Sequence, residues 1–255
     1  MPERVWDKFL TDQDKLHLSG RPRDRQPNFG KHPALLYIDL YRGVFGDKPE
    51  PLMEAIKTWP GSCGMAAWDA VPYLQTLLRT AREVGIPVAH VTGLPSTTGV
   101  MHWGDAKSGP TPVIPEDPDA ADRYHRRFDI ISEVVPIEGE IVVRKSGPSG
   151  FWCTPLAAQL YQMGVDTLIV GGESTSGCVR ASVIDACTNR FKVVVVEECV
   201  FDRHQAPHAI NLFDMNQKYA DVLPLAEVAA WLHAWKAGSG TIDRSLTEAE
   251  LTLVR

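Results

Sequence analysis

Short apolar runs alternate with helical segments along most of this chain, and this alternation restricts its possible folds more than any other feature of the sequence. An unbroken apolar run is typical of a strand covered on both faces, and strands separated by helices pair in parallel. The sequence therefore predicts a three-layer α/β/α fold, with a Rossmann-like parallel sheet of about six strands and helices on both faces. The predicted strands cover residues 34–38, 86–91, 140–145, 167–170, 192–196 and 221–223.

Glycines mark the ends of two of the predicted helices. The helices over residues 66–84 and 154–163 stop before Gly85 and Gly164, and a glycine just past the last turn is a common helix end. Further helices are predicted over residues 177–189, over residues 207–219, and through Trp235.

The length of 255 residues suits one α/β domain better than two. The predicted main domain covers residues 34–236 and is followed by a tail, residues 237–255. Residues 1–33 are predicted to form an N-terminal segment, with an amphipathic helix from Arg4 to Leu18 and then an extended arm. Such an arm often packs on a neighbouring subunit.

Two long connections and the tail carry further expectations. Residues 42–65 are rich in glycine and proline and are predicted to be a loop. Residues 93–136 are too long for an ordinary connection, so we predict a lid or a subunit-contact insertion that includes His102 and Trp103. In the tail, Ser245-Leu246-Thr247-Glu248 matches a capping box and predicts a short helix.

Charge and apolar content indicate which partners to expect. A net charge of -6 and the lack of a basic run argue against nucleic acid and favour a small-molecule partner. No apolar stretch approaches membrane-spanning length, so no membrane partner is expected. The five cysteines form no CxxC pair, and the N-terminus lacks the regions of a signal peptide, so we expect a cytoplasmic protein without disulfides.

The sequence contains no motif for a cofactor. Residues 172–177 match neither GxSxG nor a P-loop, and no GxGxxG follows the first strand. His204 and His208 are spaced as on one helix face but have no glutamate between them, and we interpret them as surface residues. We therefore expect neither a metal nor another cofactor.

Three polar residues close apolar runs that are predicted strands, namely Asp39, Lys145 and Cys178. Ligands of open α/β sheets bind at the carboxyl ends of the strands, so neighbouring strands would bring these side chains into one pocket. A carboxylate, an ammonium and a thiol suit nucleophilic attack on a carbonyl. Each residue has a structural alternative: a turn cap for Asp39, a solvated sheet edge for Lys145, and a packed small residue for Cys178.

The turn before Cys178 supplies a second feature of such a site. The start of the following helix favours thiolate at Cys178, and the N–H groups of Ser174 and Cys178 could bind a developing oxyanion. Alternatively, Thr175 or Ser176 simply caps the helix. Arg203 follows another strand and could bind a substrate carboxylate, or pair with Asp202 or Glu198 at the surface.

With these residues placed, the chain resembles the isochorismatase-like cysteine hydrolases over about residues 33–236. The matching residues are Asp39; Lys145, Ser149, Phe151, Thr154 and Leu156; and Gly172, Thr175, Cys178 and Val179. Residues 174–180, Glu3-Arg4-Val5-Trp6 and Asp202-Arg203 are most similar to the branch of N-carbamoylsarcosine and maleamate amidohydrolases.

The resemblance implies a catalytic triad of Asp39, Lys145 and Cys178, and a cis peptide between Glu173 and Ser174. It also implies that Arg203 contacts the substrate carboxylate and that the protein is a homodimer or homotetramer. Tyr41 stands where many members have glutamine, and the histidines of the nicotinamidase metal site are absent from residues 40–65. Thr175, Trp152 and Tyr41 are the further substrate-binding candidates.

The function predicted from these features is hydrolysis of a small carboxylate-bearing amide or N-carbamoyl compound through a Cys178 thioester, as in an N-carbamoylsarcosine amidase. One alternative is a maleamate amidohydrolase. A second is an isochorismatase-type vinyl-ether hydrolase, in which Asp39 acts as an acid and no thiol is needed. A third is a non-catalytic binding protein.

Overall fold

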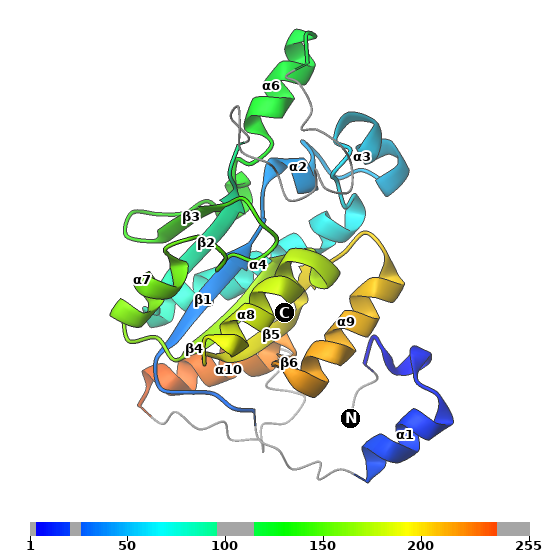
Figure 1. Cartoon of the computed structure of the whole chain (residues 1–255). Helices are drawn as coiled ribbons and strands as arrows, with labels where there is room; N and C mark the ends of the chain where they lie inside the picture. Colours follow the sequence, from blue (N-terminus) through cyan, green and yellow to red (C-terminus); the bar gives the residue numbers. More distant parts are fainter. Residues whose placement is uncertain (1–3, 21–26, 96–114, 239–255) are drawn as a thin grey trace.

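The computed structural model describes residues 4–20, 27–95 and 115–238 (Figure 1). Its centre is a six-stranded sheet in the order β3-β2-β1-β4-β5-β6, and each neighbouring pair is parallel. The predicted α/β fold is thus confirmed. The strands are β1 (Pro33–Ile38), β2 (Val88–Gly93), β3 (Ile141–Lys145), β4 (Thr167–Glu173), β5 (Lys192–Phe201) and β6 (Asp221–Leu223).

Helices cover both faces of this sheet. On one face lie α4 (Met65–Val84) and α10 (Leu225–Lys236). On the other lie α7 (Leu156–Gln162), α8 (Arg180–Thr188) and α9 (Gln205–Lys218). Strand β1 is buried along its whole length because its side chains alternate between the two layers. Leu35 and Tyr37 belong to the first core, and Leu36 and Ile38 to the second.

Two central strands are longer than predicted. Strand β4 continues through Gly171 and Gly172 to Glu173, because the missing side chains at the glycines let the chain run close to β1. Strand β5 continues past Val196 through two glutamates that have partners. Glu197 pairs with Arg4 at 2.7 Å, and Glu198 accepts the Leu225 N–H at 2.7 Å.

The predicted loop over residues 42–65 was wrong in part, since it contains α2 (Arg42–Phe45) and α3 (Leu52–Thr58). The insertion over residues 93–136 contains α6 (Pro118–Arg126) and the short η2 (Ser132–Val134). Residues 96–114, with His102 and Trp103, lie outside the described residues. The predicted capping box at 245–248 also lies outside them.

The N-terminal segment also differs from its prediction. Instead of one helix from Arg4 to Leu18, it forms η1 (Asp7–Phe9) and α1 (Asp12–Ser19), because Thr11 and Asp14 build a capping box that begins a new helix. The described part of the segment packs on its own domain. Trp6 is buried at 5% exposure.

Candidate active site

The three polar strand ends meet where the strand order reverses. From the centre of the sheet, the strand order is β1, β2, β3 toward one edge and β4, β5, β6 toward the other. The connections on the two sides therefore diverge, which opens a crevice at the carboxyl ends of β1 and β4. Asp39 follows β1, and Cys178 lies in η3 (Thr175–Val179), a π-helical turn that follows β4 and leads into α8. Lys145 ends β3, two strands away from β1, and its long side chain reaches across the end of β2.

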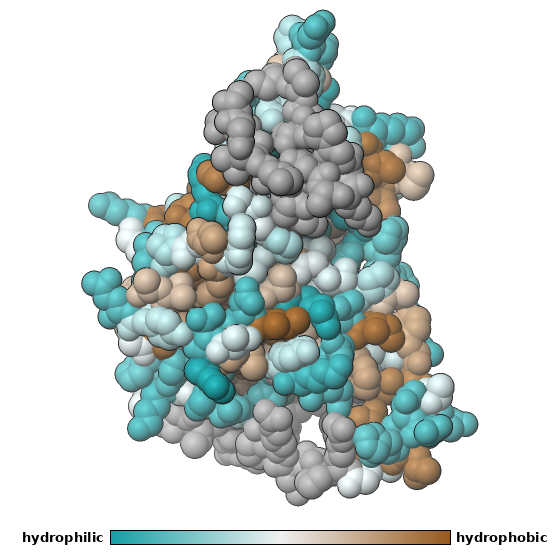
Figure 2. Space-filling model, viewed as in Figure 1, coloured by the Kyte–Doolittle hydropathy of each residue, from teal (hydrophilic) through white to brown (hydrophobic). Residues whose placement is uncertain are grey.

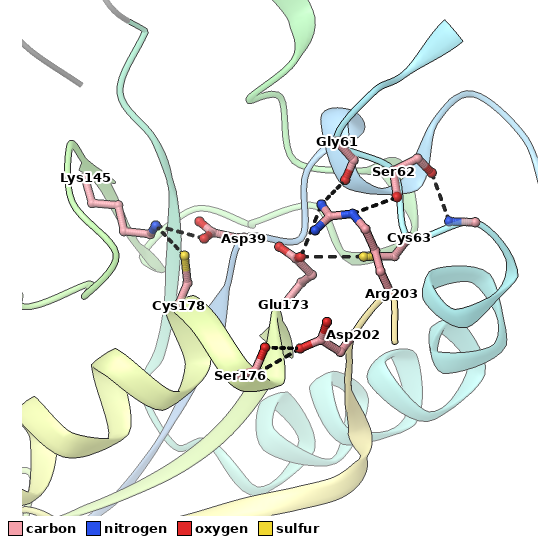
Figure 3. Close-up of polar contacts among 11 residues, drawn as sticks. Asp39, Gly61, Ser62, Cys63, Lys145, Glu173, Ser176, Cys178, Asp202 and Arg203 are labelled. Atoms are coloured by element: carbon pink, nitrogen blue, oxygen red, sulfur yellow. Dashed lines mark hydrogen bonds and ion pairs between the residues drawn. The ribbon is translucent and has the colours of Figure 1, made fainter. Parts of the chain in front are cut away.

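Lys145 joins the other two residues (Figure 3). Its Nζ lies 2.8 Å from Asp39 Oδ2 and 3.3 Å from Cys178 Sγ, and it also donates to the Gly147 carbonyl at 3.1 Å. Asp39 is fully buried and Lys145 is 6% exposed. The structure therefore brings all three predicted residues into direct contact in a place that excludes most water.

Burial and charge set the protonation of this trio. Burial, opposed by Lys145, raises the pKa of Asp39. Burial lowers the pKa of Lys145, but Asp39 and Cys178 outweigh it and hold that pKa above its usual value. Burial and then the Asp39 charge raise the pKa of Cys178 and favour its thiol form. Burial beside a carboxylate thus opposes the thiolate that the helix start was expected to favour.

The turn that carries Cys178 has well-defined bonds. The cis peptide between Glu173 and Ser174 is present. Asp202 accepts the Ser176 N–H at 2.9 Å and the Ser176 hydroxyl at 2.6 Å, so Asp202 caps the turn in place of Thr175 or Ser176. The Ser174 carbonyl accepts the N–H groups of Gly177 and Val179. These bonds leave out the N–H groups of Ser174 and Cys178, the two predicted oxyanion donors.

A cavity of about 440 Å³ lies beside these residues at the same edge of the sheet. Tyr41 and Arg203, both predicted to bind substrate, line it. Burial, helped by the charges of Asp39 and Glu173, raises the pKa of Tyr41, which ties this wall of the cavity to the trio. Its lining also includes three more aromatic side chains and two more arginines: Trp59, Tyr124, Phe128, Arg123 and Arg127.

The other two predicted substrate-binding residues do not line this cavity. Thr175 is fully buried, and its hydroxyl pairs with His208 Nδ1 at 2.8 Å. His208, expected at the surface, is accordingly half-buried. Trp152 is 59% exposed and its ring packs against Gly147. These two side chains thus contact other parts of the protein.

Arg203 is held by the segment between α3 and α4. Its Nε donates to the Ser62 carbonyl at 3.0 Å, and its Nη2 donates to the Gly61 carbonyl. Nη2 also lies 3.7 Å from Oε1 of Glu173. The surface pairings that were the alternative for Arg203 are not formed, because Asp202 and Glu198 bind the backbone N–H groups of Ser176 and Leu225.

Glu173 is the site residue that sequence reasoning missed. It ends β4, is 5% exposed, and lines the cavity. Burial and the nearby Asp39 charge raise the pKa of Glu173 to about 7, although Arg203 opposes them. Its position was a usable signal, because an acidic residue at the end of a buried strand is the pattern that identified Asp39.

The described part of the chain contains neither a candidate metal cluster nor a helix that could span a membrane. Within residues 4–20, 27–95 and 115–238, no group of three or more His, Cys, Asp or Glu could hold a metal ion. Across those same residues, every helix is too short or too polar to cross a membrane.

Known proteins are similar to this chain in sequence and in fold. The Isochorismatase domain family matches residues 33–227. The maleamate amidohydrolase of Pseudomonas putida is 37% identical over 203 residues, covering 76% of this chain and 84% of that protein. The N-carbamoylsarcosine amidase of an Arthrobacter species is 30% identical over 236 residues, covering 89% of this chain and 81% of that protein.

Solved structures at lower identity have the same fold. A cysteine hydrolase from Pseudomonas syringae pv. phaseolicola superposes with a TM-score of 0.69 at 20% identity, covering 85% of this chain and 99% of that chain. The N-carbamoylsarcosine amidase from Thermoplasma acidophilum superposes with a TM-score of 0.54 at 24% identity, covering 76% of this chain and 96% of that chain.

Proposed function

Because this chain belongs to the isochorismatase family, as its sequence predicted, we propose that it hydrolyses a small carboxylate-bearing amide or N-carbamoyl compound through a Cys178 thioester. Its relatives are named amidohydrolases, which supports cleavage of a C–N bond. The observation that carries the proposal is the position of Lys145 Nζ, 2.8 Å from Asp39 and 3.3 Å from Cys178.

In the first half of the proposed reaction, Asp39 takes the proton of the Cys178 thiol and Sγ attacks the carbonyl carbon. This route suits a thiol whose pKa is raised, because such a nucleophile needs a neighbouring base. Lys145 stabilises the negative charge on the pair, and the N–H groups of Ser174 and Cys178 bind the oxyanion. The C–N bond then breaks, Asp39 returns its proton to the leaving nitrogen, and ammonia departs.

In the second half, Asp39 takes a proton from a water molecule, and the oxygen attacks the thioester carbonyl. The C–S bond breaks, and the proton held by Asp39 restores the Cys178 thiol. For an amide, the net reaction consumes one water and gives one carboxylic acid and one ammonia; for an N-carbamoyl compound it gives ammonia and a carbamic acid, which breaks down to the amine and CO2. No oxidant or further reactant is required.

The substrate carboxylate is proposed to bind Arg203 in the aromatic and cationic cavity. The bonds from Arg203 to Gly61 and Ser62 use Nε and Nη2, which leaves Nη1 for an anion. Arg123 and Arg127 add positive charge to the same cavity and support an anionic substrate. Tyr41 stays in the proposed binding set as part of the wall.

The test is an ammonia-release screen of the purified protein over maleamate, N-carbamoyl amino acids and nicotinamide. We expect turnover of the amides that carry a carboxylate and weak or no turnover of nicotinamide. Cys178→Ala should abolish turnover, while Cys187→Ala, a matched change at another half-buried cysteine, should not. Intact-mass measurement after rapid acid quenching should find the acyl group on Cys178 only.

Appreciable amide hydrolysis by Cys178→Ala would contradict the thioester route. Release of pyruvate from isochorismate by that variant would instead support the vinyl-ether alternative. An intact protein that binds carboxylated amides but releases no ammonia from any of them would support the non-catalytic alternative.

A further inference from the structure

The carboxylate of Glu173 is a buried charged group in the cavity that the proposed reaction does not use. It is the last residue of β4, immediately before the turn that carries Cys178. Only 5% of the residue is exposed, and it lines the cavity. A buried carboxylate is costly unless hydrogen-bond donors satisfy it, so its partners matter.

Among the described residues, hydrogen-bond donors approach only one oxygen of Glu173. The Cys63 thiol, a weak donor, lies 3.5 Å from Oε1, and Arg203 Nη2 lies 3.7 Å from the same oxygen, beyond ordinary hydrogen-bond length. Within the described part of the chain, no donor contacts Oε2. A ligand in the cavity could therefore provide the donor that the fold leaves out.

Glu173 also has a defined place along the site. In Figure 3 its carboxylate lies between the Asp39–Cys178 pair and the guanidinium of Arg203. A substrate whose scissile carbonyl is at Cys178 and whose carboxylate is at Arg203 would place its middle atoms beside Glu173. Because the Glu173 carboxylate accepts hydrogen bonds, the middle of the substrate would have to carry a hydrogen-bond donor to pair with it.

We propose that Glu173 is a specificity-determining residue that accepts a hydrogen bond from a substrate N–H between the scissile carbonyl and the carboxylate. This inference rests on the proposed amidohydrolase function. The substrate class that fits is an N-carbamoyl amino acid with a free ureido N–H, which has carbonyl, N–H and carboxylate in that order. Maleamate lacks this donor, and N-carbamoylsarcosine has a methyl group in its place.

The charge on Glu173 gives the preference a pH dependence. The groups that face it are Asp39 after β1, Tyr41, Cys63, Cys178, and Asp202 and Arg203 after β5. Because the pKa of Glu173 is raised to about 7, its carboxylate is mostly neutral at pH 6 and mostly ionised at pH 8. An ionised acceptor binds an N–H group more strongly, so the preference for the donor should increase with pH.

The test compares N-carbamoylglycine with succinamate, which differ only by NH in place of CH2 in the middle of the molecule. Both release ammonia, so one assay gives kcat/KM for each, and the ratio cancels any general loss of activity in a variant. In Glu173→Gln, which keeps a neutral acceptor, the ratio at pH 8 should fall at least about 10-fold. In Glu173→Met, which has no such acceptor, it should fall further.

The pH dependence and the controls are measured with the same ratio of kcat/KM for N-carbamoylglycine to kcat/KM for succinamate. Between pH 8 and pH 6 the wild-type ratio should fall several-fold, and the Glu173→Gln ratio should stay flat. Glu138→Gln, an exposed glutamate outside the cavity, should behave as wild type. If a Glu173 variant turns over neither substrate, the two dissociation constants measured by calorimetry in the Cys178→Ala background replace the kinetic ratio.

The outcomes separate this inference from the function on which it rests. A wild-type ratio that Glu173→Gln and Glu173→Met leave unchanged overturns the role of Glu173, while turnover of succinamate keeps the amidohydrolase. Turnover of succinamate with none of N-carbamoylglycine also overturns it. Failure of the wild type to release ammonia from any carboxylated amide overturns the proposed function instead.

Discussion

Asp39 has no exposed surface, and its backbone stands in the left-handed region at a φ of 57°. An aspartate tolerates this conformation better than most residues, which lets the chain turn sharply where β1 ends. At this turn the chain leaves the direction of the strand, and the Asp39 carboxylate points toward Lys145. Burial raises the pKa of Asp39, and a stronger base suits the thiol of Cys178.

Asp39→Asn should separate turnover from thiol reactivity. Loss of the proposed base should lower kcat/KM for ammonia release by about 1,000-fold. The same change removes the negative charge that raises the pKa of Cys178 and keeps Lys145, so the pKa of Cys178 should fall. Iodoacetamide at pH 7 should then label Cys178 faster in the variant than in wild type, as measured by peptide mass spectrometry.

The control for this change is Asp69→Asn, at an exposed aspartate on α4, which should match wild type in both measurements. Turnover by Asp39→Asn within 10-fold of wild type would exclude Asp39 as the base, since about 100-fold is the least that a general base supplies.

At the level of elements, the end of β4 is the segment that assembles the site. Gly172 has a φ of 130° and lies so close to β1 that a Cβ atom there would be 2.0 Å from the Ile38 carbonyl oxygen. The close approach of the two backbones brings Glu173 and the Cys178 turn against the end of β1, where Asp39 follows. Glycine at 172 is therefore a requirement of the site as well as of the sheet.

Gly172→Ala should destabilise the protein by about 3 kcal/mol or more, because it adds overlap with backbone to the strain of a positive φ. Gly85→Ala is the matched control: its φ is 82°, and nothing lies within 4 Å of the added Cβ. That change should cost about 1 kcal/mol, from φ strain alone. Urea denaturation measures both, and equal costs would mean that β1 can move away from residue 172.

At the level of the whole molecule, the N-terminal segment and helix α10 pack against the domain. Arg4 pairs with Glu197 and donates to the Val222 carbonyl, which ties the chain start to β5 and β6. Phe29 stacks on Trp231 of α10 with ring centroids 4.0 Å apart. On the face drawn in Figure 2, hydrophobic side chains are scattered among hydrophilic ones. The predicted homodimer or homotetramer stays a prediction.

Trp6→Ala should destabilise the protein by about 3 to 5 kcal/mol, because a buried aromatic side chain would leave a cavity in the core shared with α9. Leu16→Ala is the contrasting change on the same segment, since Leu16 is 75% exposed. It should alter the unfolding free energy by no more than about 0.5 kcal/mol. A small effect of Trp6→Ala in thermal or urea unfolding would mean that the segment is not part of the folded core.

The sequence by itself determined the layered fold and the three strand-end residues. Apolar runs and helix-ending glycines such as Gly85 are local features, and a polar residue that closes a buried strand reports the edge where ligands bind. The sequence pattern alone therefore places Asp39, Lys145 and Cys178 at one edge of the sheet. Their contact depends on the strand order, in which β1 and β4 are neighbours and Lys145 reaches past β2.

Only the tertiary structure decided what surrounds these residues. Cys63 and Glu173 are in contact although they are 110 positions apart in the sequence. A pattern of neighbouring residues cannot predict such a contact. The contacts of Arg203 with Gly61 and Ser62, and the burial that raises the pKa of Cys178, also depend on parts of the chain that are distant in sequence. Burial and long-range contacts set pKa values and pocket walls, because both depend on how elements pack and not on the order of residues within them.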